Sequence, residues 1–210
     1  MKIGIIGSGN VGGALGTRWA QAGHTVTFGS RNPGGDDMRQ LTAEAGETAR
    51  AASFKEAAEV SEALLLATPW PATRSVAEGL GDLAGKVLID ATNPLLPSLA
   101  GLEYGTTTSG AEQVAGWVRG ARLVKAFNTV GFNIMANPAF GPDRPVMFYC
   151  GDDSAAKQTV RPLIEQLGFE PMDAGPLVQA RLLEPFALLW VSLAYAQGQG
   201  REIGFKFLRR

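Results

Sequence analysis

A glycine-rich segment directly after an apolar run constrains the fold of this chain more than any other feature. Residues Gly7-Ser8-Gly9-Asn10-Val11-Gly12 fit the pattern G-x-G-x-x-G, which by itself is a weak signal. Here the pattern follows the apolar run Ile3–Ile6 and opens a segment with apolar residues at Val11, Leu15 and Trp19, as on one face of a helix. A strand, a glycine turn and a helix in this order predict a dinucleotide-binding fold.

The three glycines of this segment have separate expected roles. Gly7 allows a tight turn, Gly9 lets the backbone approach a pyrophosphate, and Gly12 lets the helix pack closely against the strand. The helix N-terminus then offers free N–H groups and a partial positive charge to the phosphates. A glycine-rich turn without a ligand is the alternative, and the agreement of motif, position and following strand disfavours it.

Short apolar runs alternate with longer amphipathic segments along the whole chain, which is typical of a parallel sheet covered by helices. The expected strands are Lys2–Gly7, Thr25–Gly29, Ala63–Thr68, Lys86–Ala91, Arg122–Phe127, Pro145–Gly151 and Phe169–Asp173. The expected helices are Val11–Ala22, Asp36–Ala45, Phe54–Val60, Ala72–Leu80, Ala111–Val118, Asn133–Asn137, Ala155–Leu167 and Ala180–Gln197. We therefore predict an α/β fold of the Rossmann type, with a doubly wound, mainly parallel sheet. Residues 1–210 form a single domain with an extra C-terminal helix in this interpretation.

Two helix starts and one long loop are also readable. Ser109 and Glu112 form a capping-box pattern, and Ser154 is expected to cap the helix that Gly168 ends. The stretch from Asn93 to Gly110 is irregular, and a loop of this length inside a compact domain is usually functional.

The end of the second expected strand favours NADP over NAD. Enzymes that use NAD usually place a carboxylate there to hold the adenosine 2′-hydroxyl. In this chain the strand is followed by Ser30-Arg31-Asn32, and no carboxylate appears before Asp36. A guanidinium fork and a hydroxyl suit a 2′-phosphate, although Arg31 could instead be a solvated loop residue.

Composition excludes several other classes of chemistry and partner. His24 and Cys150 are the only histidine and cysteine, so His-dependent triads, cysteine clusters and multi-histidine metal sites are not expected. A formal net charge of −1 without a basic block argues against nucleic acid as a partner. The longest apolar stretch, near Leu182–Tyr195, is expected to be too short to span a membrane, and no signal-peptide pattern is visible. We therefore expect a cytoplasmic protein without a metal site.

The remaining candidates each have a plainer alternative. The rigid segment Thr68-Pro69-Trp70-Pro71 follows a strand and suits a planar ring, but Trp70 could equally be core. Asn128 follows an apolar strand, where an asparagine more often caps a turn. Asp90 could be an acid, yet a structural cap on the following loop is the stronger interpretation, and Cys150 is expected in the core. No catalytic side chain is predicted.

Taken together, the motifs resemble a known family over nearly the whole chain, the NADPH-dependent reductases of the deazaflavin coenzyme F420. They are also similar to the NADPH-binding domains of the STEAP metalloreductases. The segments that carry the resemblance are Gly7–Gly12, Gly29–Arg31, Thr68–Trp70, Asp90–Leu95, Lys125–Thr129, Asp173–Leu177 and Ala180–Glu184. This chain has only Ser8 where archaeal members carry an extra glycine and a threonine. It also has Asn32 and Pro33 where some members have further basic residues.

The resemblance implies a cleft along the carboxyl ends of the strands. NADP would lie across the phosphate loop, with its nicotinamide near Trp70, Asn93 and the Asn128-Thr129 turn, and the acceptor ring would stack over it. The cofactor-binding residues expected beyond the phosphate loop are Ser30, Arg31, Asn32, Thr68, Pro69, Trp70, Asn93, Pro94, Ala126, Asn128 and Thr129.

Two functions of different classes fit these observations. The first is an NADPH-dependent oxidoreductase that passes a hydride between NADP(H) and F420 or another flavin as a small-molecule acceptor, without an obligatory protein acid or base. The second is an NADP-binding sensing module with no turnover of its own. Reduction of an imine or carbonyl is disfavoured, because no second domain is expected. The apolar surface of Ala180–Gln197 predicts a homodimer.

Overall fold

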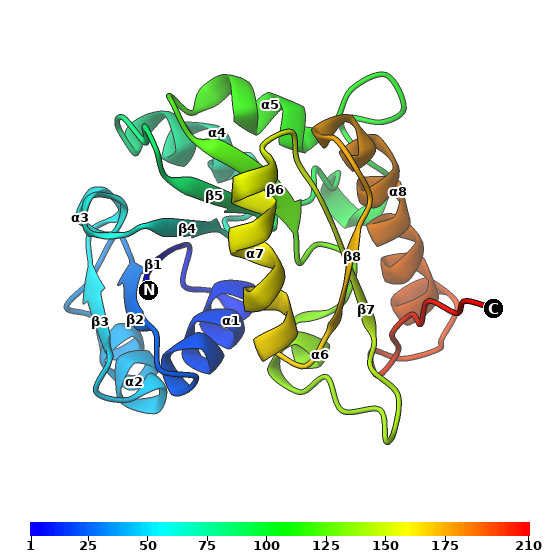
Figure 1. Cartoon of the computed structure of the whole chain (residues 1–210), viewed down its shortest axis with the longest axis horizontal. Coiled ribbons are helices and arrows are strands. Elements are labelled where there is room, and N and C mark those ends of the chain that lie inside the picture. The colour runs from blue at the N-terminus through cyan, green and yellow to red at the C-terminus, as the bar shows by residue number, and fades with distance from the viewer.

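The computed structural model describes the whole chain, residues 1–210, and its strands all lie in one sheet (Figure 1). The strands are β1 (Lys2–Ile6), β2 (Thr25–Gly29), β3 (Ala49–Ala52), β4 (Ala63–Leu66), β5 (Val87–Asp90), β6 (Arg122–Ala126), β7 (Val146–Cys150) and β8 (Glu170–Asp173). Their spatial order is β3-β2-β1-β4-β5-β6-β7-β8. The first six strands are parallel to one another, β7 pairs antiparallel with β6, and β8 pairs parallel with β7. The predicted doubly wound, mainly parallel sheet is confirmed.

Helices cover both faces of this sheet (Figure 1). They are α1 (Asn10–Gln21), α2 (Asp36–Ala45), α3 (Phe54–Val60), α4 (Trp70–Gly79), α5 (Gly110–Trp117), α6 (Phe132–Ala136), α7 (Ser154–Gln166) and α8 (Ala180–Val191). Successive residues of a strand point to opposite faces, so Ile3 and Ile5 pack with α1, α2, α6 and α7. Ile6, Leu64 and Leu66 pack on the other face with α3, α4, α5 and α8.

Close packing and side-chain hydrogen bonds fix α1 on the sheet. Trp19 packs edge-on against Phe127 at 5.6 Å between ring centroids, and its Nε1 donates to the carbonyl of Leu163. The Arg18 guanidinium donates to the carbonyl oxygens of Met135 and Leu167, near the ends of α6 and α7. Burial lowers the pKa of Arg18 from its ordinary value. The N-terminus of α1 is thereby held at the carboxyl edge of the parallel strands.

Three local features differ from the sequence-based expectations. The edge strand β3 was not expected, because its sequence Ala-Arg-Ala-Ala lacks the β-branched and aromatic residues that signal a strand. Asp153, rather than Ser154, caps α7, since its carboxylate accepts from the backbone N–H of Ala156. Ser109 does cap α5, but Glu112 bonds the Ser109 hydroxyl rather than its backbone N–H.

The C-terminal helix is longer than the sequence suggested. A short 3-10 turn (Leu177–Gln179), α8 and a π-helical turn (Ser192–Ala196) run on without a break. The resulting segment, Leu177–Ala196, is long and apolar enough by length and composition to cross a bilayer, so the expectation that it is too short was wrong. In the structure its inner face packs into the core through Leu183, Ala187 and Trp190.

Candidate functional site

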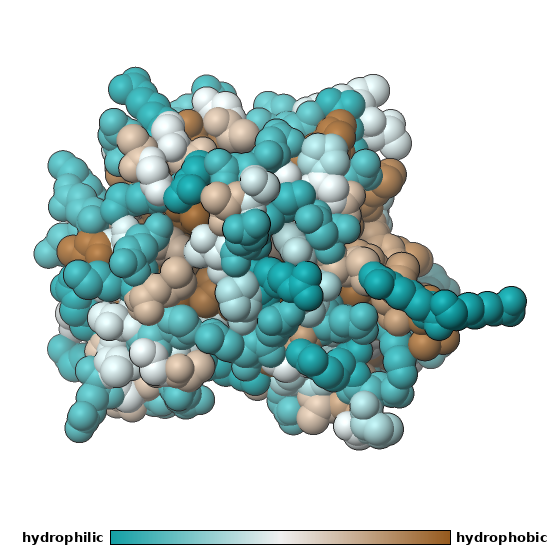
Figure 2. Space-filling view, viewed as in Figure 1, coloured by the Kyte–Doolittle hydropathy of each residue, from teal (hydrophilic) through white to brown (hydrophobic).

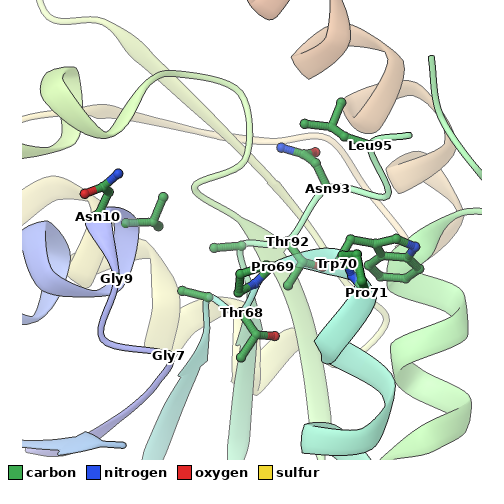
Figure 3. A pocket seen from close by; sticks show the side chains of 13 residues that line it. Gly7, Gly9, Asn10, Thr68, Pro69, Trp70, Pro71, Thr92, Asn93 and Leu95 are labelled. Atoms are coloured by element: carbon green, nitrogen blue, oxygen red, sulfur yellow. The ribbon is translucent and has the colours of Figure 1, made fainter. Parts of the chain in front are cut away.

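A cleft of about 370 Å³ opens at the carboxyl edge of β1, β4 and β5 (Figure 3). The strand order reverses between β1 and β4, and open α/β sheets bind ligands at such switch points. Asn10 and Trp70 lie on opposite sides of the cleft (Figure 3). We refer to it as the first cleft, and its lining residues are Gly7, Gly9, Asn10, Val11, Ala67, Thr68, Pro69, Trp70, Pro71, Ala91, Thr92, Asn93 and Leu95.

A second cleft of similar volume lies on the other side of the α1 N-terminus. Its lining comes from the phosphate loop, from the residue after β2 and from α2, namely Ser8, Gly9, Asn10, Gly13, Ser30, Asp37, Met38, Gln40, Leu41 and Glu44. Gly9 and Asn10 line both clefts. Two hollows that meet over a helix N-terminus match the two halves of a dinucleotide joined by a pyrophosphate.

The glycines of the phosphate loop have different surroundings. A Cβ on Gly12 would lie 1.9 Å from the carbonyl oxygen of Gly7, so α1 can approach β1 this closely only with glycine there. Gly7 has a φ of +105°, and a Cβ on it would meet the carbonyl of Ala67 at 2.7 Å. A Cβ on Gly9 would face open space. The first two glycines therefore build the turn, while Gly9 leaves room in front of it.

The first turn of α1 has backbone N–H groups that no side chain caps. Gly9 is the N-cap and no side chain caps the helix, so the N–H groups that open α1 lack a side-chain partner. No acidic residue lies in this turn. An anion at this position would be favoured by both the free N–H groups and the helix dipole.

Trp70 forms the far wall of the first cleft and is half-buried. Its indole Nε1 donates to the Glu103 carboxylate at 2.8 Å, and its ring packs near Tyr104 and Trp117 at 5.9 and 5.5 Å between centroids. Burial and the neighbouring Glu103 raise the pKa of Tyr104. The ring lines the cleft and also packs against the core on that face, and its contact with a planar ligand stays a prediction.

A reciprocal pair of asparagines joins the third side of the first cleft, which Asn93 lines, to the buried Asn128 behind it. The Asn93 side chain donates to the Asn128 carbonyl at 2.9 Å, and the Asn128 side chain donates to Asn93 Oδ1 at 3.1 Å. Phe127, between β6 and Asn128, has a φ of +60°, which is uncommon for a bulky residue. Strained backbone of this kind is concentrated at functional sites.

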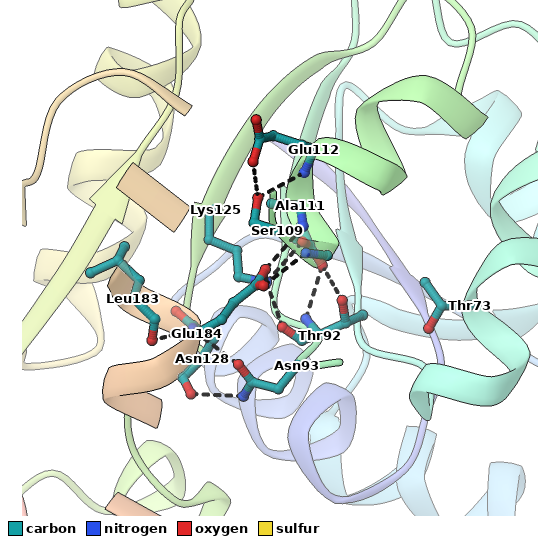
Figure 4. Close-up of polar contacts among 12 residues, drawn as sticks. Thr73, Thr92, Asn93, Ser109, Ala111, Glu112, Lys125, Asn128, Leu183 and Glu184 are labelled. Carbon is teal, nitrogen blue, oxygen red and sulfur yellow. Dashed lines mark hydrogen bonds and ion pairs between the residues drawn. The ribbon is translucent and has the colours of Figure 1, made fainter. Parts of the chain in front are cut away.

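A fully buried charged cluster lies behind the wall of the first cleft that Thr92 and Asn93 form (Figure 4). The Lys125 ammonium is 3.0 Å from Asp90 Oδ2 and 3.0 Å from Glu184 Oε1. Burial alone would lower the pKa of Lys125, but the two carboxylates outweigh it and raise that pKa above its ordinary value. Asp90 also accepts from the backbone N–H and the hydroxyl of Thr92, which confirms its expected role as a cap of the following loop.

The sequence interpretation did not find this cluster, although a signal was present. Lys125 stands inside the apolar segment Leu123–Phe127, Asp90 ends an apolar strand, and Glu184 lies in an apolar helix. Buried charges are almost always paired, so three isolated charges in apolar segments should have been matched with one another.

The predicted site residues fall into three groups. Those that line one of the two clefts are Gly7, Ser8, Gly9, Asn10, Val11, Ser30, Thr68, Pro69, Trp70 and Asn93. Arg31 and Asn32 are exposed beside Ser30, whose hydroxyl accepts from the Asn32 N–H. The buried ones that line neither cleft are Gly12, Pro94, Ala126, Asn128 and Thr129. Their roles toward a cofactor stay predictions, and the sequence did not single out Ala67, Pro71, Ala91, Thr92 or Leu95.

The only histidine and the only cysteine lie away from the clefts, and the expected core position of Cys150 is confirmed. His24 is half-buried and bonds to Gln166 and to the N-terminal amine, at the amino end of β2. Cys150 is buried in β7, and burial raises the pKa of its thiol to about 12. Neither side chain lines either cleft.

Comparison with known proteins agrees with this geometry. Residues 2–94 match the family model of NADP oxidoreductases that are coenzyme F420-dependent. The F420-dependent NADP reductase of Methanothermobacter marburgensis is 30% identical over 210 residues, which cover 92% of each chain. The chain belongs to the F420-dependent NADP reductase family. It is therefore an NADP-dependent oxidoreductase.

Two further relatives extend the comparison of this reductase. A crystal structure of a candidate F420-dependent NADP reductase from Arthrobacter sp. FB24 superposes with a TM-score of 0.89 at 32% identity, and the match covers both chains completely. Metalloreductase STEAP3 of Rattus norvegicus is 34% identical over 189 residues. The matched part is 89% of this chain but only 36% of STEAP3, so the reductase spans about a third of that relative's length.

The open space at Gly9 generates a first prediction. In Gly9→Ala a methyl group would stand where the pyrophosphate is expected, so the affinity for NADPH should fall about tenfold or more. The melting temperature should not fall, because the new Cβ contacts nothing in the protein. Fluorescence titration with NADPH and thermal melting check both parts. The control is Gly79→Ala at the end of α4, where a Cβ also meets nothing. Unchanged affinity in Gly9→Ala would contradict the placement of the pyrophosphate.

The position of Ser30 and Arg31 generates a second prediction. Arg31 is exposed and forms no ion pair, so its guanidinium is free to meet a 2′-phosphate beside the second cleft. Replacing it in Arg31→Glu should weaken NADPH binding about ten- to a hundredfold and leave NADH binding nearly unchanged. Titration of both cofactors measures the ratio, with Arg39→Glu on α2 as a control that alters an exposed Arg–Asp pair instead. Equal loss for both cofactors would refute a role in selecting the phosphate.

Proposed function

We propose that this reductase transfers a hydride directly between NADP(H) and the ring of coenzyme F420 or another flavin. The observation that supports this most is the lining of the first cleft, which contains no Asp, Glu, His, Cys, Lys or Arg. Backbone, two prolines, an indole and two side-chain amides surround the space instead. Such a lining can position flat rings but offers no side chain that titrates, and direct hydride transfer needs none.

In this proposal the two clefts hold the two halves of the cofactor. Ser30 and Arg31 would bind the adenosine 2′-phosphate, and Gly9 with the first turn of α1 would bind the pyrophosphate. The nicotinamide would then enter the first cleft, between Trp70 and the Asn93 side chain. The first cleft opens to solvent, and the acceptor ring would approach the nicotinamide from that side.

The electron balance of the step is simple. The hydride leaves the nicotinamide C4 with both electrons of the C–H bond, so NADPH becomes NADP⁺ and the acceptor ring is reduced by two electrons. The acceptor also gains one proton, which solvent supplies because no titratable side chain lines the cleft. Holding two rings in near-contact contributes up to about 7–11 kcal/mol to lowering the barrier in favourable systems.

A turnover assay tests this proposal. Purified protein should oxidise NADPH when F420 is added, as followed by the loss of absorbance of the acceptor, with FMN, FAD and riboflavin assayed beside it. Trp70→Ala should slow turnover, because it removes the wall against which a ring packs and its hydrogen bond to Glu103. His24→Ala, at the amino end of β2, should leave turnover unchanged. Tight NADPH binding without turnover on any of the four acceptors would instead support an NADP-sensing module.

We also propose that the active form is a homodimer, built on the outer face of α8. Large apolar side chains are exposed on and beside α8: Val178 before it, Leu182 and Leu189 on it, and Tyr195 in the turn after it are each 42–64% exposed. Figure 2 shows hydrophobic residues on the side of the molecule where α8 lies. Exposed apolar groups in a row favour burial against a second copy of the same face.

The proposed homodimer predicts that the protein in solution has the mass of two chains. Leu189→Asp should convert the dimer to a monomer, because a carboxylate in the interface would have to be buried without a partner. The control is Leu208→Asp, which places the same charge at an exposed apolar residue of the C-terminal tail and should stay dimeric. Light scattering at micromolar concentration measures both. A monomeric wild-type protein would contradict the proposal.

A further inference from the structure

The buried Lys125 ammonium contacts two segments that are far apart in the sequence. It donates to Asp90 Oδ2 at the end of β5 and to the backbone carbonyl of Thr92 at 2.5 Å, and it forms an ion pair with Glu184 Oε1 on α8. Lys125, Asp90 and Glu184 have side chains that are at most 1% exposed. The ammonium is thus held among three oxygen atoms and is closed off from solvent.

The first of these segments leads directly to the cleft. Asp90 and Lys125 are register partners on the neighbouring parallel strands β5 and β6. The second oxygen of Asp90 accepts from both the N–H and the hydroxyl of Thr92. Thr92 and Asn93 line the first cleft. Lys125 therefore holds the Thr92–Asn93 wall of the first cleft through two contacts, indirectly through Asp90 and directly through the Thr92 carbonyl.

The second segment ties the same wall to α8. Glu184 accepts from the backbone N–H groups of Gly110 and Ala111, the first two residues of α5. The neighbouring carbonyl of Leu183 accepts from the Asn128 side chain, which is paired with Asn93. Figure 4 shows Thr92 and Glu184 converging on Lys125 from opposite sides.

We infer that Lys125 is a positioning residue for hydride transfer, which holds the Thr92–Asn93 wall at a fixed place beside the nicotinamide. The inference rests on the proposed function. The lysine does not line the cleft, so it acts through Asp90 and the Thr92 carbonyl rather than on the reacting atoms. Apolar residues of similar volume can often replace a buried ion pair without loss of stability, but they cannot orient a carbonyl group. The cluster therefore fixes the position of the Thr92–Asn93 backbone and does more than stabilise the fold.

The test is a double variant that keeps the charge of the cluster. The native cluster carries one positive and two negative charges. Lys125→Met with Asp90→Asn leaves the Glu184 carboxylate, which retains its two N–H donors from α5, so the net charge of −1 is unchanged. The rate of hydride transfer, measured by stopped-flow with saturating NADPH, should fall about ten- to a hundredfold, because a small displacement of a positioning group has an effect of that size.

The Kd for NADPH should distinguish a loss of positioning from general damage to the fold. The phosphate loop belongs to β1 and α1 and does not touch the cluster, so the Kd for NADPH should change by less than about twofold. Lys86→Met is the matched control. Lys86 also donates to two backbone carbonyls, those of Glu59 and Ser61, but it lies at the amino end of β5. Its hydride-transfer rate should equal that of the wild type.

A readout without turnover keeps this inference distinct from the proposed function. In the native protein the Thr92 N–H is buried and bonded to Asp90, so its hydrogen exchange should be slow. It should accelerate in the single variant Lys125→Met, which leaves the Asp90 acceptor in place. If wild-type protein reduces no acceptor, the proposed function fails, and exchange at Thr92 still decides whether Lys125 orders the wall. If the double variant does not fold, Glu184→Gln, which weakens the same contact, should slow hydride transfer at unchanged Kd. A folded variant with native exchange at Thr92 and native rate would overturn the inference.

Discussion

The approach of α1 to β1 is the contact on which the rest of this structure depends. The carbonyl of Gly7 occupies the space that a side chain at Gly12 would need, so the helix starts directly above the end of the strand. This arrangement aims the first turn of α1 at the reversal of strand order, with a cleft on either side. Packing of Trp19 on Phe127 and the hydrogen bonds of Arg18 hold the helix there. A helix N-terminus without a side-chain cap and two hollows follow from one close contact.

Charge is distributed unevenly in this site, and the distribution fits the proposed hydride transfer. The first cleft has no ionisable lining, while a fully buried ammonium with two carboxylates lies directly behind its wall. Removing three charges from water is costly unless every donor and acceptor is satisfied. Here Lys125 donates to Asp90 and to Thr92 and pairs with Glu184, Glu184 accepts from the N-terminus of α5, and Asp90 accepts from Thr92. The charges therefore order the backbone without presenting a titrating group to the reaction.

Much of the fold could be predicted from the sequence, because its signals are local. The buried parallel strands have continuous apolar runs, and the glycine motif fixes the first β-turn-α unit. The strand β3 was missed because its alanines carry no β-sheet preference and only pairing with β2 makes it a strand. The cap of α7 was placed one residue late because Asp153 and Ser154 are both good cap residues, and only the backbone conformation distinguishes them.

The site was predictable in part for a related reason. Glycines and prolines impose backbone conformations that can be read along the chain, so the phosphate loop and the segment Thr68–Pro71, where α4 begins, were located. In the Lys125 cluster the two carboxylates lie 35 and 59 sequence positions away from the lysine, and no local sequence pattern indicates that these residues pair. The same holds for the Asn93–Asn128 pair, whose members were both named but not matched. Such contacts depend on which strands and helices lie next to each other in the folded protein. No short stretch of sequence shows this arrangement.

Direct transfer of hydrogen from the nicotinamide to the acceptor ring is the central claim, and an isotope label follows that atom. NADPH carrying deuterium at C4 would be mixed with the reductase and oxidised F420 in a stopped-flow instrument, and the reduced product analysed by mass. A cleft without ionisable lining predicts that the deuterium arrives on the F420 ring and that the reaction is slowed by a primary isotope effect. Deuterium found in water, with unlabelled reduced F420, would contradict direct transfer and would require an acid or base that the first cleft does not contain.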